Sequence, residues 1–299
     1  MAILSIQSHV VSGYAGNSAA VFPMQRLGRE VWAVNTVEFS NHTGYGAWTG
    51  RVLGAALSAE LVRGLYERGL LARCEALLSG YLGDAEAGKV IADTVRLVRK
   101  EAGSALYCCD PVMGDMGKGL YVNPDIPGIF KNELCALADI ITPNQFELET
   151  LTGIKTGSID NARRAINALH EKGPPVVLVT SYHEENDPGG DNGELQINML
   201  ASDKTGIYRI TTPMLPLGAN MAGTGDLTAA VFLSRYLETA SLKPTLELCT
   251  ASVYGILEKT FATYKNTNQN RTEPLELRII EMQEELVAPS RFFEAVVVK

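Results

Sequence analysis

Short apolar segments alternate with stretches of helical spacing through most of this chain, and that alternation limits its fold more than any other feature. The apolar segments lie at residues 2–7, 31–37, 75–79, 106–109, 138–141 and 176–180. Strands that alternate with helices build βαβ units, in which a parallel sheet lies between two layers of helices. We therefore expect an α/β fold, a three-layer sandwich with a central, mainly parallel sheet flanked by helices.

Capping residues mark where several of the intervening helices are expected to begin. A side-chain oxygen at the N-cap accepts a hydrogen bond from an amide of the first helical turn. We expect Ser58, Asp84 and Ser158 to serve in this way. Proline suits the first helical position, because its missing N–H would have no partner there. Pro143 is therefore expected to open a helix over 144–151.

The second half of the chain adds further elements to the alternating pattern. Residues 195–200 and 206–210 predict a β-hairpin. Residues 245–263 have the spacing of a long helix, and the tail over 277–282 and 292–298 is strand-like or ambiguous.

Composition limits the classes of function open to the chain. No long polar linker divides its 299 residues, so we expect one domain, 1–299. The formal net charge is −8 and no lysine or arginine run occurs, which argues against a nucleic-acid surface. No apolar run is long enough to span a membrane, and the start lacks the basic flank of a signal peptide. The five cysteines form no CxxC pair, so buried, reduced thiols in a cytoplasmic protein are expected.

A glycine-rich turn, Gly223-Thr224-Gly225-Asp226, stands directly before a helical pattern over 227–233. Glycine lets the backbone turn sharply and approach a ligand closely. The unpaired amides of a helix N-terminus attract anions such as phosphate. Asp226 could accept a proton from a substrate hydroxyl. Taken alone, however, the motif favours a structural turn whose carboxylate complements the helix dipole.

Polar side chains follow the expected strands at the points where these strands end. They are Ser8, Thr43, Tyr81, Asp110, Thr142 and Thr180. Ligands of open α/β sheets bind beyond the carboxyl ends of the strands. We therefore expect these side chains to meet at one site, although each alone could merely bond to nearby backbone.

Three carboxylates in the middle of the chain are candidate metal ligands. Asp110, Asp115 and Glu147 supply hard oxygen atoms, which suit Mg²⁺. The alternative for Glu147 is a capping role in the first turn of a helix, and for Asp110 a turn before proline. Other motifs fail: residues 83–90 lack the hydroxyl that a P-loop needs for magnesium, and the third glycine of a dinucleotide fingerprint is missing after Gly225.

The chain resembles the pyridoxal kinases of the ribokinase-like superfamily. The blocks that carry the likeness are residues 5–11, 13–17, 39–45, 80–81, 109–112, 141–147 and 223–226. The glycine–aspartate motif marks the superfamily. The blocks around Ser8-His9 and Asn41-His42-Thr43 narrow the likeness to pyridoxal kinases.

The resemblance implies transfer of the γ-phosphate of ATP to the 5′-hydroxymethyl group of pyridoxal, pyridoxine or pyridoxamine. It implies that Asp226 is the general base, and that the amides of Gly223, Thr224 and Gly225 form the anion hole for the transferring group.

By the same likeness, the vitamin lies among residues from the first half of the chain. Ser8 would bond to the pyridine nitrogen, and Thr43, with Gly44, would contact the region of the ring hydroxyl. Tyr81 would line the ring pocket.

The likeness also implies a metal site beside the phosphates of ATP. Asp110, Thr142 and Glu147 would order the metal and the phosphates, with Asp115 nearby. The expected ions are Mg²⁺ and a monovalent cation, K⁺ or Na⁺.

The nucleotide is expected to extend from these ions along the later strands. Thr180 and Ser181 would lie under it, and the segment 211–222, with Thr211 and Met214, would lie against the adenine.

The glycine-rich loop 115–121 would be a flap that closes over the substrates, through Gly117, Lys118, Gly119 and Tyr121. The family resemblance further implies a homodimer.

Three alternatives remain open at this point. A hydroxymethylpyrimidine or sugar kinase would have the same fold, and a non-catalytic vitamin-binding protein could have the same pocket. A nicotinamide dehydrogenase is disfavoured by the missing fingerprint.

Overall fold

A ten-stranded sheet forms the centre of the molecule in this computed structural model, which describes residues 1–185, 195–216, 221–265 and 274–298. Its strands are β1 Ala2–Val10, β2 Glu30–Phe39, β3 Gly50–Val52, β4 Cys74–Ser79, β5 Leu106–Cys109, β8 Ile140–Ile141, β9 Val176–Tyr182, β10 Gln196–Asp203, β11 Gly206–Pro213 and β12 Val296–Val297. They lie in the order β12-β11-β10-β9-β8-β5-β4-β1-β2-β3. Two short strands, β6 Gly114–Asp115 and β7 Gly119–Leu120, pair as a separate hairpin.

The middle of the sheet is parallel and its two edges are antiparallel. Every pairing from β2 through β1, β4, β5 and β8 to β9 is parallel. The strand β3 at one edge and the run β10-β11-β12 at the other pair antiparallel. The expected mainly parallel sheet is therefore confirmed.

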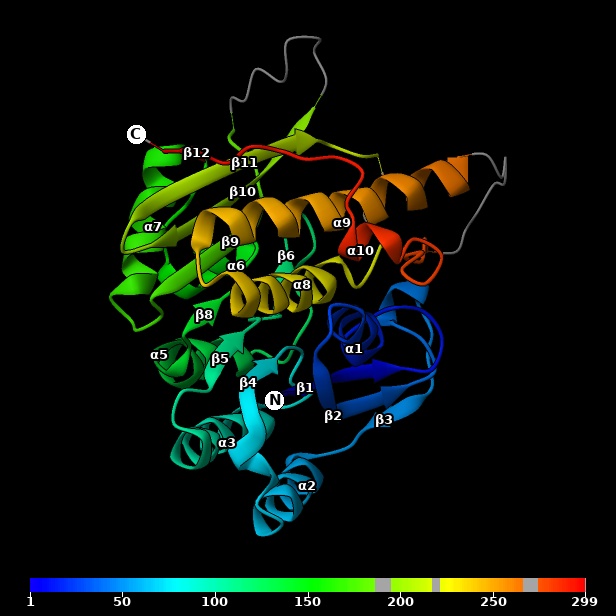
Figure 1. The fold of residues 1–299 in the computed structure, drawn as a ribbon, viewed down its shortest axis with the longest axis vertical. Helices are drawn as coiled ribbons and strands as arrows, with labels where there is room; N and C mark the ends of the chain where they lie inside the picture. The colour runs from blue at the N-terminus through cyan, green and yellow to red at the C-terminus, as the bar shows by residue number, and fades with distance from the viewer. Residues whose placement is uncertain (186–194, 217–220, 266–273, 299) are drawn as a thin grey trace.

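Helices cover both faces of this sheet (Figure 1). One face carries α1 Asn17–Arg26, α8 Thr224–Thr239, α9 Leu242–Lys265 and α10 Glu284–Val287, whose apolar side chains share one buried cluster. The other face carries α2 Ala55–Glu67, α3 Ala85–Ala102, α6 Gln145–Thr152 and α7 Ile159–His170, which contribute to a second cluster. The short helices α4 Ile126–Ile129 and α5 Cys135–Leu137 lie between β7 and β8 in the chain. The result is the three-layer arrangement that the sequence predicts.

Strand β9 shows why its sequence reads as a continuous apolar run. Val177 and Val179 belong to one buried cluster, while Val176 and Leu178 belong to the other. Successive side chains of a strand point to opposite faces, and both faces of a parallel sheet are covered by helices. Every position must therefore be apolar, and strict alternation with polar residues is lost.

Two of the expected helix caps are confirmed, and one is wrong. Asp84 accepts a hydrogen bond from the amide of Ala87 at 2.8 Å, and Ser158 accepts one from the amide of Asn161. Ser58 instead lies buried inside α2, which begins after Gly54. The three residues before Ser58 are alanine, alanine and leucine, which favour helix and extend it backwards.

The start of α6 also differs from the expectation. Pro143 was expected at the first helical position, but Asn144 is the N-cap and the helix begins at Gln145. The side chain of Asn144 accepts from the amide of Glu147, and the side chain of Glu147 accepts from the amide of Asn144. This reciprocal capping box satisfies two amides that a proline start would leave unpaired.

The second half of the chain matches the expected elements except in its tail. The β10–β11 hairpin and the long helix α9 are confirmed, both longer than expected. Residues 277–282 do not form a strand, whereas the end of the tail contributes β12. The five cysteines are buried and free, as expected. We propose that one domain spans 1–299, because one sheet recruits strands from both ends of the chain.

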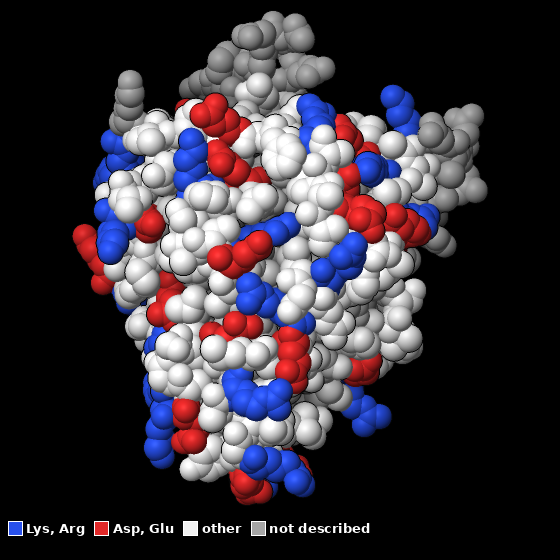
Figure 2. All heavy atoms as spheres, viewed as in Figure 1, with Lys and Arg blue, Asp and Glu red and all other residues white. Residues whose placement is uncertain are grey.

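Surface charge and helix composition add two general observations. Acidic and basic side chains are interspersed over the face shown in Figure 2. Among the described residues, no helix combines the length and apolar character that membrane crossing requires.

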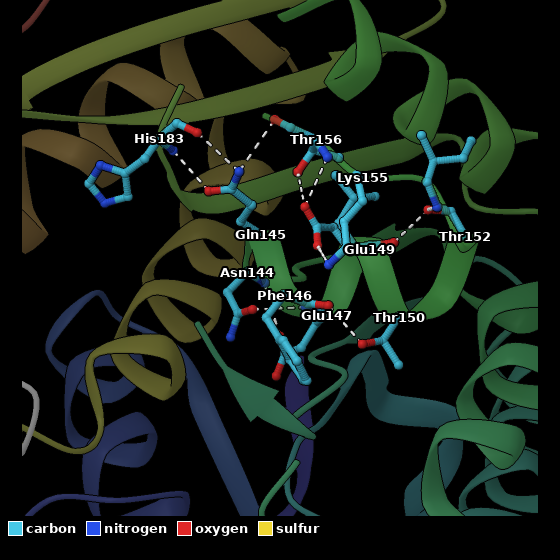
Figure 3. A network of polar contacts seen from close by, with 12 residues as sticks. Asn144, Gln145, Phe146, Glu147, Glu149, Thr150, Thr152, Lys155, Thr156 and His183 are labelled. Carbon is cyan, nitrogen blue, oxygen red and sulfur yellow. Dashed lines mark hydrogen bonds and ion pairs between the residues drawn. The ribbon is translucent and has the colours of Figure 1, made fainter. Parts of the chain in front are cut away.

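A buried carboxylate fastens the C-terminal end of α6 to the loop that follows it (Figure 3). Glu149 accepts hydrogen bonds from the amide of Thr156 at 2.9 Å, from its hydroxyl at 3.0 Å and from the ammonium group of Lys155 at 2.6 Å. Burial alone would raise the pKa of Glu149, but these bonds outweigh it and hold the pKa below the usual 4.5. The charged form is therefore the form that stabilises the fold.

We predict that Glu149→Gln lowers the free energy of unfolding at pH 7 by about 1–3 kcal/mol, the range for hydrogen bonds to a charged group. Because the folded-state pKa lies below the unfolded value, this stabilisation is present above about pH 4.5 and is lost as the pH falls through the folded-state pKa. Urea unfolding of both proteins between pH 3 and 7 measures the difference. Glu67→Gln, on the exposed side of α2, is the control. A difference that persists unchanged at pH 3 would contradict the assignment.

Candidate active site

A cavity of about 780 Å³ lies at the carboxyl ends of the parallel strands. Its lining includes the sequence-predicted residues Ser8, Thr43, Gly44, Tyr81, Asp110, Asp115, Lys118, Tyr121, Thr142, Glu147, Thr180, Ser181, Met214, Gly223, Thr224, Gly225 and Asp226. Four strand spacings separate β1 from β9, which at about 4.8 Å each makes roughly 19 Å. The site therefore has room for two ligands end to end.

Three predicted residues do not line the cavity. Thr211 is one of them, and its hydroxyl donates to Oδ1 of Asn198 at 2.7 Å; its contact with the nucleotide stays a prediction. Gly117 and Gly119 of the predicted flap are also absent from the lining. In the segment 211–222, residues 217–220 lie outside the described residues.

Several lining residues have no motif in the sequence that would identify them. The hairpin contributes Ile197, Asn198, Met199 and Ile210, and α9 contributes Thr250, Val253, Tyr254 and Leu257. Thr212, Pro213 and Leu215, which also line the cavity, fall within the segment 211–222 that was expected against the adenine. One sequence feature points to the residues of α9: this helix has apolar residues on more than one side, which indicates that the sheet alone does not cover them.

The glycine–aspartate motif forms the N-terminus of α8 at the edge of this cavity. Gly223 is the N-cap with a left-handed φ of 82°, and α8 begins at Thr224. A Cβ atom on Gly223 would collide with the carbonyl oxygen of Tyr14, so both the backbone angle and the space demand glycine. The first amides of α8 have no partner within the helix and border the cavity, an arrangement that suits an anion such as phosphate.

Asp226 lies in the first turn of α8, half-buried and facing the cavity. Burial raises the pKa of its carboxyl group, against hydrogen bonds from the amide of Gly16 and from its own amide, which lower it. The amide of Gly16 thus fixes the carboxylate to the loop after β1. A fixed carboxylate beside an anion site is the arrangement that a general base for phosphate transfer requires.

Asp110 is buried in the site and has one carboxyl oxygen that no hydrogen bond satisfies among the described residues. Its Oδ1 accepts a hydrogen bond from the hydroxyl of Thr142 at 3.0 Å, whereas its buried Oδ2 has no hydrogen-bond partner among the described residues. Burial raises the pKa of Asp110 well above its usual value, and the carboxylates of Glu147 and Asp226 raise it further. A bare carboxylate oxygen among like charges fits a bound cation.

The cation would need ligands beyond these side chains. The described residues hold no group of three acidic, histidine or cysteine side chains placed to bind one metal, so Asp110, Asp115 and Glu147 do not converge as a cage. Asp115 is exposed, and its Oδ1 accepts from the amide of Met116. Mg²⁺ commonly keeps water and phosphate oxygens among its ligands, which suits such an open site.

The capping role considered for Glu147 is confirmed, and its metal-ligand role stays a prediction. Figure 3 shows it beside Asn144 in the capping box. Its other oxygen accepts from the amide of Met113 at 2.9 Å. Burial raises the pKa of Glu147 to about 8, against the hydrogen bonds from Asn144 and Met113, which lower it. It is therefore a structural cap that also presents a carboxylate to the cavity.

The β6–β7 hairpin lies over this part of the site. Asn144 donates to the carbonyl oxygen of Gly114 at 2.8 Å, which fastens the hairpin to the start of α6. Asp115, Lys118 and Tyr121 face the cavity, and Tyr121 is 51% exposed. These positions suit a hinged cover.

Backbone strain is stored at the end of β9. Ser181 has a φ of 53°, in the left-handed region that non-glycine residues rarely adopt. Strained residues of this kind persist where the surrounding structure holds them, often at ligand sites. The amide of the preceding Thr180 donates to the carbonyl oxygen of Pro143, which helps to hold the turn.

The other end of the cavity, at β1 and β2, combines apolar walls with hydroxyl groups. Val10, Val37 and Phe39 supply the walls. Ser8 and Thr43 supply hydroxyl groups. This end suits a flat ring that carries polar substituents.

Comparisons with known proteins agree with this geometry. Residues 56–271 match the family described as Phosphomethylpyrimidine kinase. The chain is 48% identical over 287 residues to pyridoxal kinase PdxY of Rubrobacter xylanophilus, covering 96% of this chain and 94% of that protein. It is 44% identical to pyridoxal kinase PdxY of Granulibacter bethesdensis, with 99% of both chains covered. Pyridoxal kinase from Leishmania donovani in complex with ADP and pyridoxamine matches with a TM-score of 0.87, at 28% identity and 99% coverage of both chains.

The fold and these matches define a small-molecule kinase of the ribokinase-like superfamily. Within it, the chain belongs to the pyridoxal kinase family. The resemblance inferred from the sequence is confirmed, as is its assignment as a kinase.

Gly223 forms the turn before α8, whereas Gly225 lies inside the helix, so alanine should have a different effect at each position. We predict that Gly223→Ala destabilises the protein by about 1–3 kcal/mol, because the left-handed φ and the Tyr14 carbonyl both oppose a Cβ atom. Gly225→Ala is the matched control: a Cβ there meets nothing within 4 Å, and alanine in a helix is favoured by up to about 1 kcal/mol. Urea unfolding measures both. Equal effects would contradict the predicted contact.

Proposed function

We propose that this chain transfers the γ-phosphate of ATP to the 5′-hydroxymethyl group of pyridoxal, and also of pyridoxine and pyridoxamine. The observation that carries the proposal is the single cavity itself, which joins a ring-sized end at β1 and β2 to the N-terminus of α8. Asp226 lies at that N-terminus and faces the same cavity.

At the vitamin end, Ser8 bonds to the pyridine nitrogen, and Thr43 and Gly44 contact the region of the ring hydroxyl. Tyr81 lines the face of the ring. The support for these roles is that all four residues line the end of the cavity where the apolar walls lie.

At the transfer point, Asp226 accepts the proton of the 5′-hydroxyl group as that oxygen attacks the γ-phosphorus. The amides of Gly223, Thr224 and Gly225 hold the transferring group as its negative charge spreads over the equatorial oxygens. Phosphoryl transfer depends mainly on such positioning and charge stabilisation. The protein holds these groups in place before the substrates bind, which supports the assignment.

At the nucleotide end, the adenine lies between the β10–β11 hairpin and α9. Met214, Val253 and Leu257 offer apolar contact there, and all of them line the cavity. Thr180 and Ser181 lie under the phosphates, where the left-handed turn directs their backbone groups.

Magnesium would be held by Asp110, together with phosphate oxygens and water, with Thr142 and Glu147 beside it. When bound, it would neutralise the charge of the phosphates during transfer. The bare Oδ2 of Asp110 supports this placement. A monovalent cation, K⁺ or Na⁺, would share the same acidic region.

The proposal extends to the flap, the cellular location and the oligomeric state. The flap over 115–121 closes across the substrates, led by Lys118 and Tyr121, and excludes water from the transfer. The protein works in the cytoplasm as a homodimer.

We predict that Asp226→Asn lowers kcat by about 10²–10⁴-fold, the usual contribution of a general base. The affinity for ATP should stay within about twofold, because the amide anion site and the apolar contacts of adenine are unchanged. Steady-state kinetics and calorimetric titration with ATP measure the two effects. A variant that retains full turnover would contradict the role of Asp226 as the base.

The same kinetics decide between the proposal and its alternatives. A panel of the three vitamers, hydroxymethylpyrimidine and simple sugars should give turnover mainly with the vitamers. Turnover of hydroxymethylpyrimidine or a sugar, with no turnover of pyridoxal, would contradict the proposed substrate. Binding of pyridoxal without ATP-dependent product would instead indicate a non-catalytic vitamin-binding protein.

A further inference from the structure

We propose that Glu276 is a positioning residue that holds the vitamin end of the active site together from the C-terminal part of the chain. The inference rests on the proposed function, because it concerns the acceptor side of the same cavity. Glu276 belongs to no motif and lies between α9 and α10.

One carboxylate group joins two loops that are distant in sequence. Its Oε2 accepts a hydrogen bond from the amide of Tyr14 at 3.0 Å. Its Oε1 lies 3.0 Å from Nε2 of His42 and accepts a hydrogen bond from the hydroxyl of Tyr45 at 2.9 Å. Bonds to a charged acceptor are stronger than neutral ones, so this carboxylate ties the loop after β1 to the loop after β2.

Both loops border the vitamin end of the cavity. The first contributes Ala15 to the lining, and the second contributes His42, Thr43 and Gly44. His42 also caps the 3₁₀ turn Thr43–Tyr45, because the amide of Gly44 donates to its Nδ1 at 3.2 Å. The imidazole ring thus connects Glu276 directly to the turn that carries Thr43.

The loop after β1 also reaches the catalytic motif. The carbonyl oxygen of Tyr14 lies against Gly223, and the amide of Gly16 bonds to the Asp226 carboxylate. A displacement of this loop would therefore move the base as well as the pocket wall.

The local structure is built to keep Glu276 in place. Its side chain is only 19% exposed, and its backbone amide and carbonyl both bond to the hydroxyl of Tyr264 in the last turn of α9. The next residue, Leu277, is fully buried. Gly13 has a φ of 89°, and a Cβ atom there would collide with the Glu276 carboxylate. The loop is therefore shaped to admit this side chain.

None of these contacts lies at the nucleotide end of the cavity. Loss of the Glu276 carboxylate should therefore change the kinetic constants for pyridoxal more than those for ATP. For Glu276→Ala we expect KM for pyridoxal to rise about tenfold or more and kcat to fall, with KM for ATP within about twofold of wild type. Misplacement by about 1 Å at a reacting centre is enough for changes of this size. Glu276→Gln, which keeps the shape and one acceptor, should give a smaller change in the same direction.

Glu281→Ala is the matched control, because Glu281 lies five residues further along the chain, is half exposed and forms an ion pair with Arg278 on the surface. Glu281→Ala should leave KM for pyridoxal, KM for ATP and kcat unchanged. Unchanged constants in Glu276→Ala, or a fall in kcat with both KM values unchanged, would overturn the proposal and leave Glu276 a purely structural residue.

Amide hydrogen exchange tests the inference independently of any substrate. In Glu276→Ala, exchange should quicken over 12–16 and 42–46, while the strands of the sheet keep their protection. If the wild-type chain phosphorylates no vitamer, the proposed function fails and the exchange of these two loops alone decides the role of Glu276. Unchanged exchange in both loops would overturn it.

Discussion

The contact between the start of α8 and the loop after β1 determines how the active site is assembled. Gly223 approaches the Tyr14 carbonyl more closely than any side chain would permit, and the amide of Gly16 bonds to Asp226. This contact brings together residues that are about two hundred positions apart in the chain. It sets the N-terminus of α8 against the strand that carries Ser8, so that Asp226 and Ser8 line one cavity. Neither element could form the site alone.

Electrostatics gives the second constraint, because the site gathers buried acidic groups. Burial raises the pKa values of Asp110, Glu147 and Asp226; the carboxylates of Glu147 and Asp226 raise that of Asp110 further, and the carboxylate of Asp115 raises that of Glu147. ATP would bring more negative charge to the same place. The amides at the start of α8 compensate part of it, and a cation at the bare oxygen of Asp110 would compensate more. A metal ion bound together with the nucleotide would account for the acidity of the site.

The sequence predicts the parts of this arrangement that depend on local rules. The apolar runs identify the strands, Asp84 and Ser158 mark helix starts, and Gly223 signals a turn that only glycine can form. Prediction fails where tertiary packing decides between alternative local structures, each of which the sequence allows. Ser58 is a good cap by type, yet the helix extends past it because its neighbours favour helix. Asn144 replaces Pro143 at the start of α6 because only Asn144 can form the capping box with Glu147.

Distance along the chain explains why the remaining site residues could not be found. Thr211 and Thr212 are neighbours of the same type, yet Thr212 lines the cavity whereas the hydroxyl of Thr211 bonds to Asn198. Val253 and Leu257 look like ordinary core residues of a helix, since apolar spacing does not reveal whether a ligand or the sheet covers them. Glu276 is the extreme case. Its neighbours in sequence carry no signal, and its partners Tyr14 and His42 lie more than two hundred residues away. Its importance arises from the fold, which returns the C-terminal segment to the loops of the first two strands.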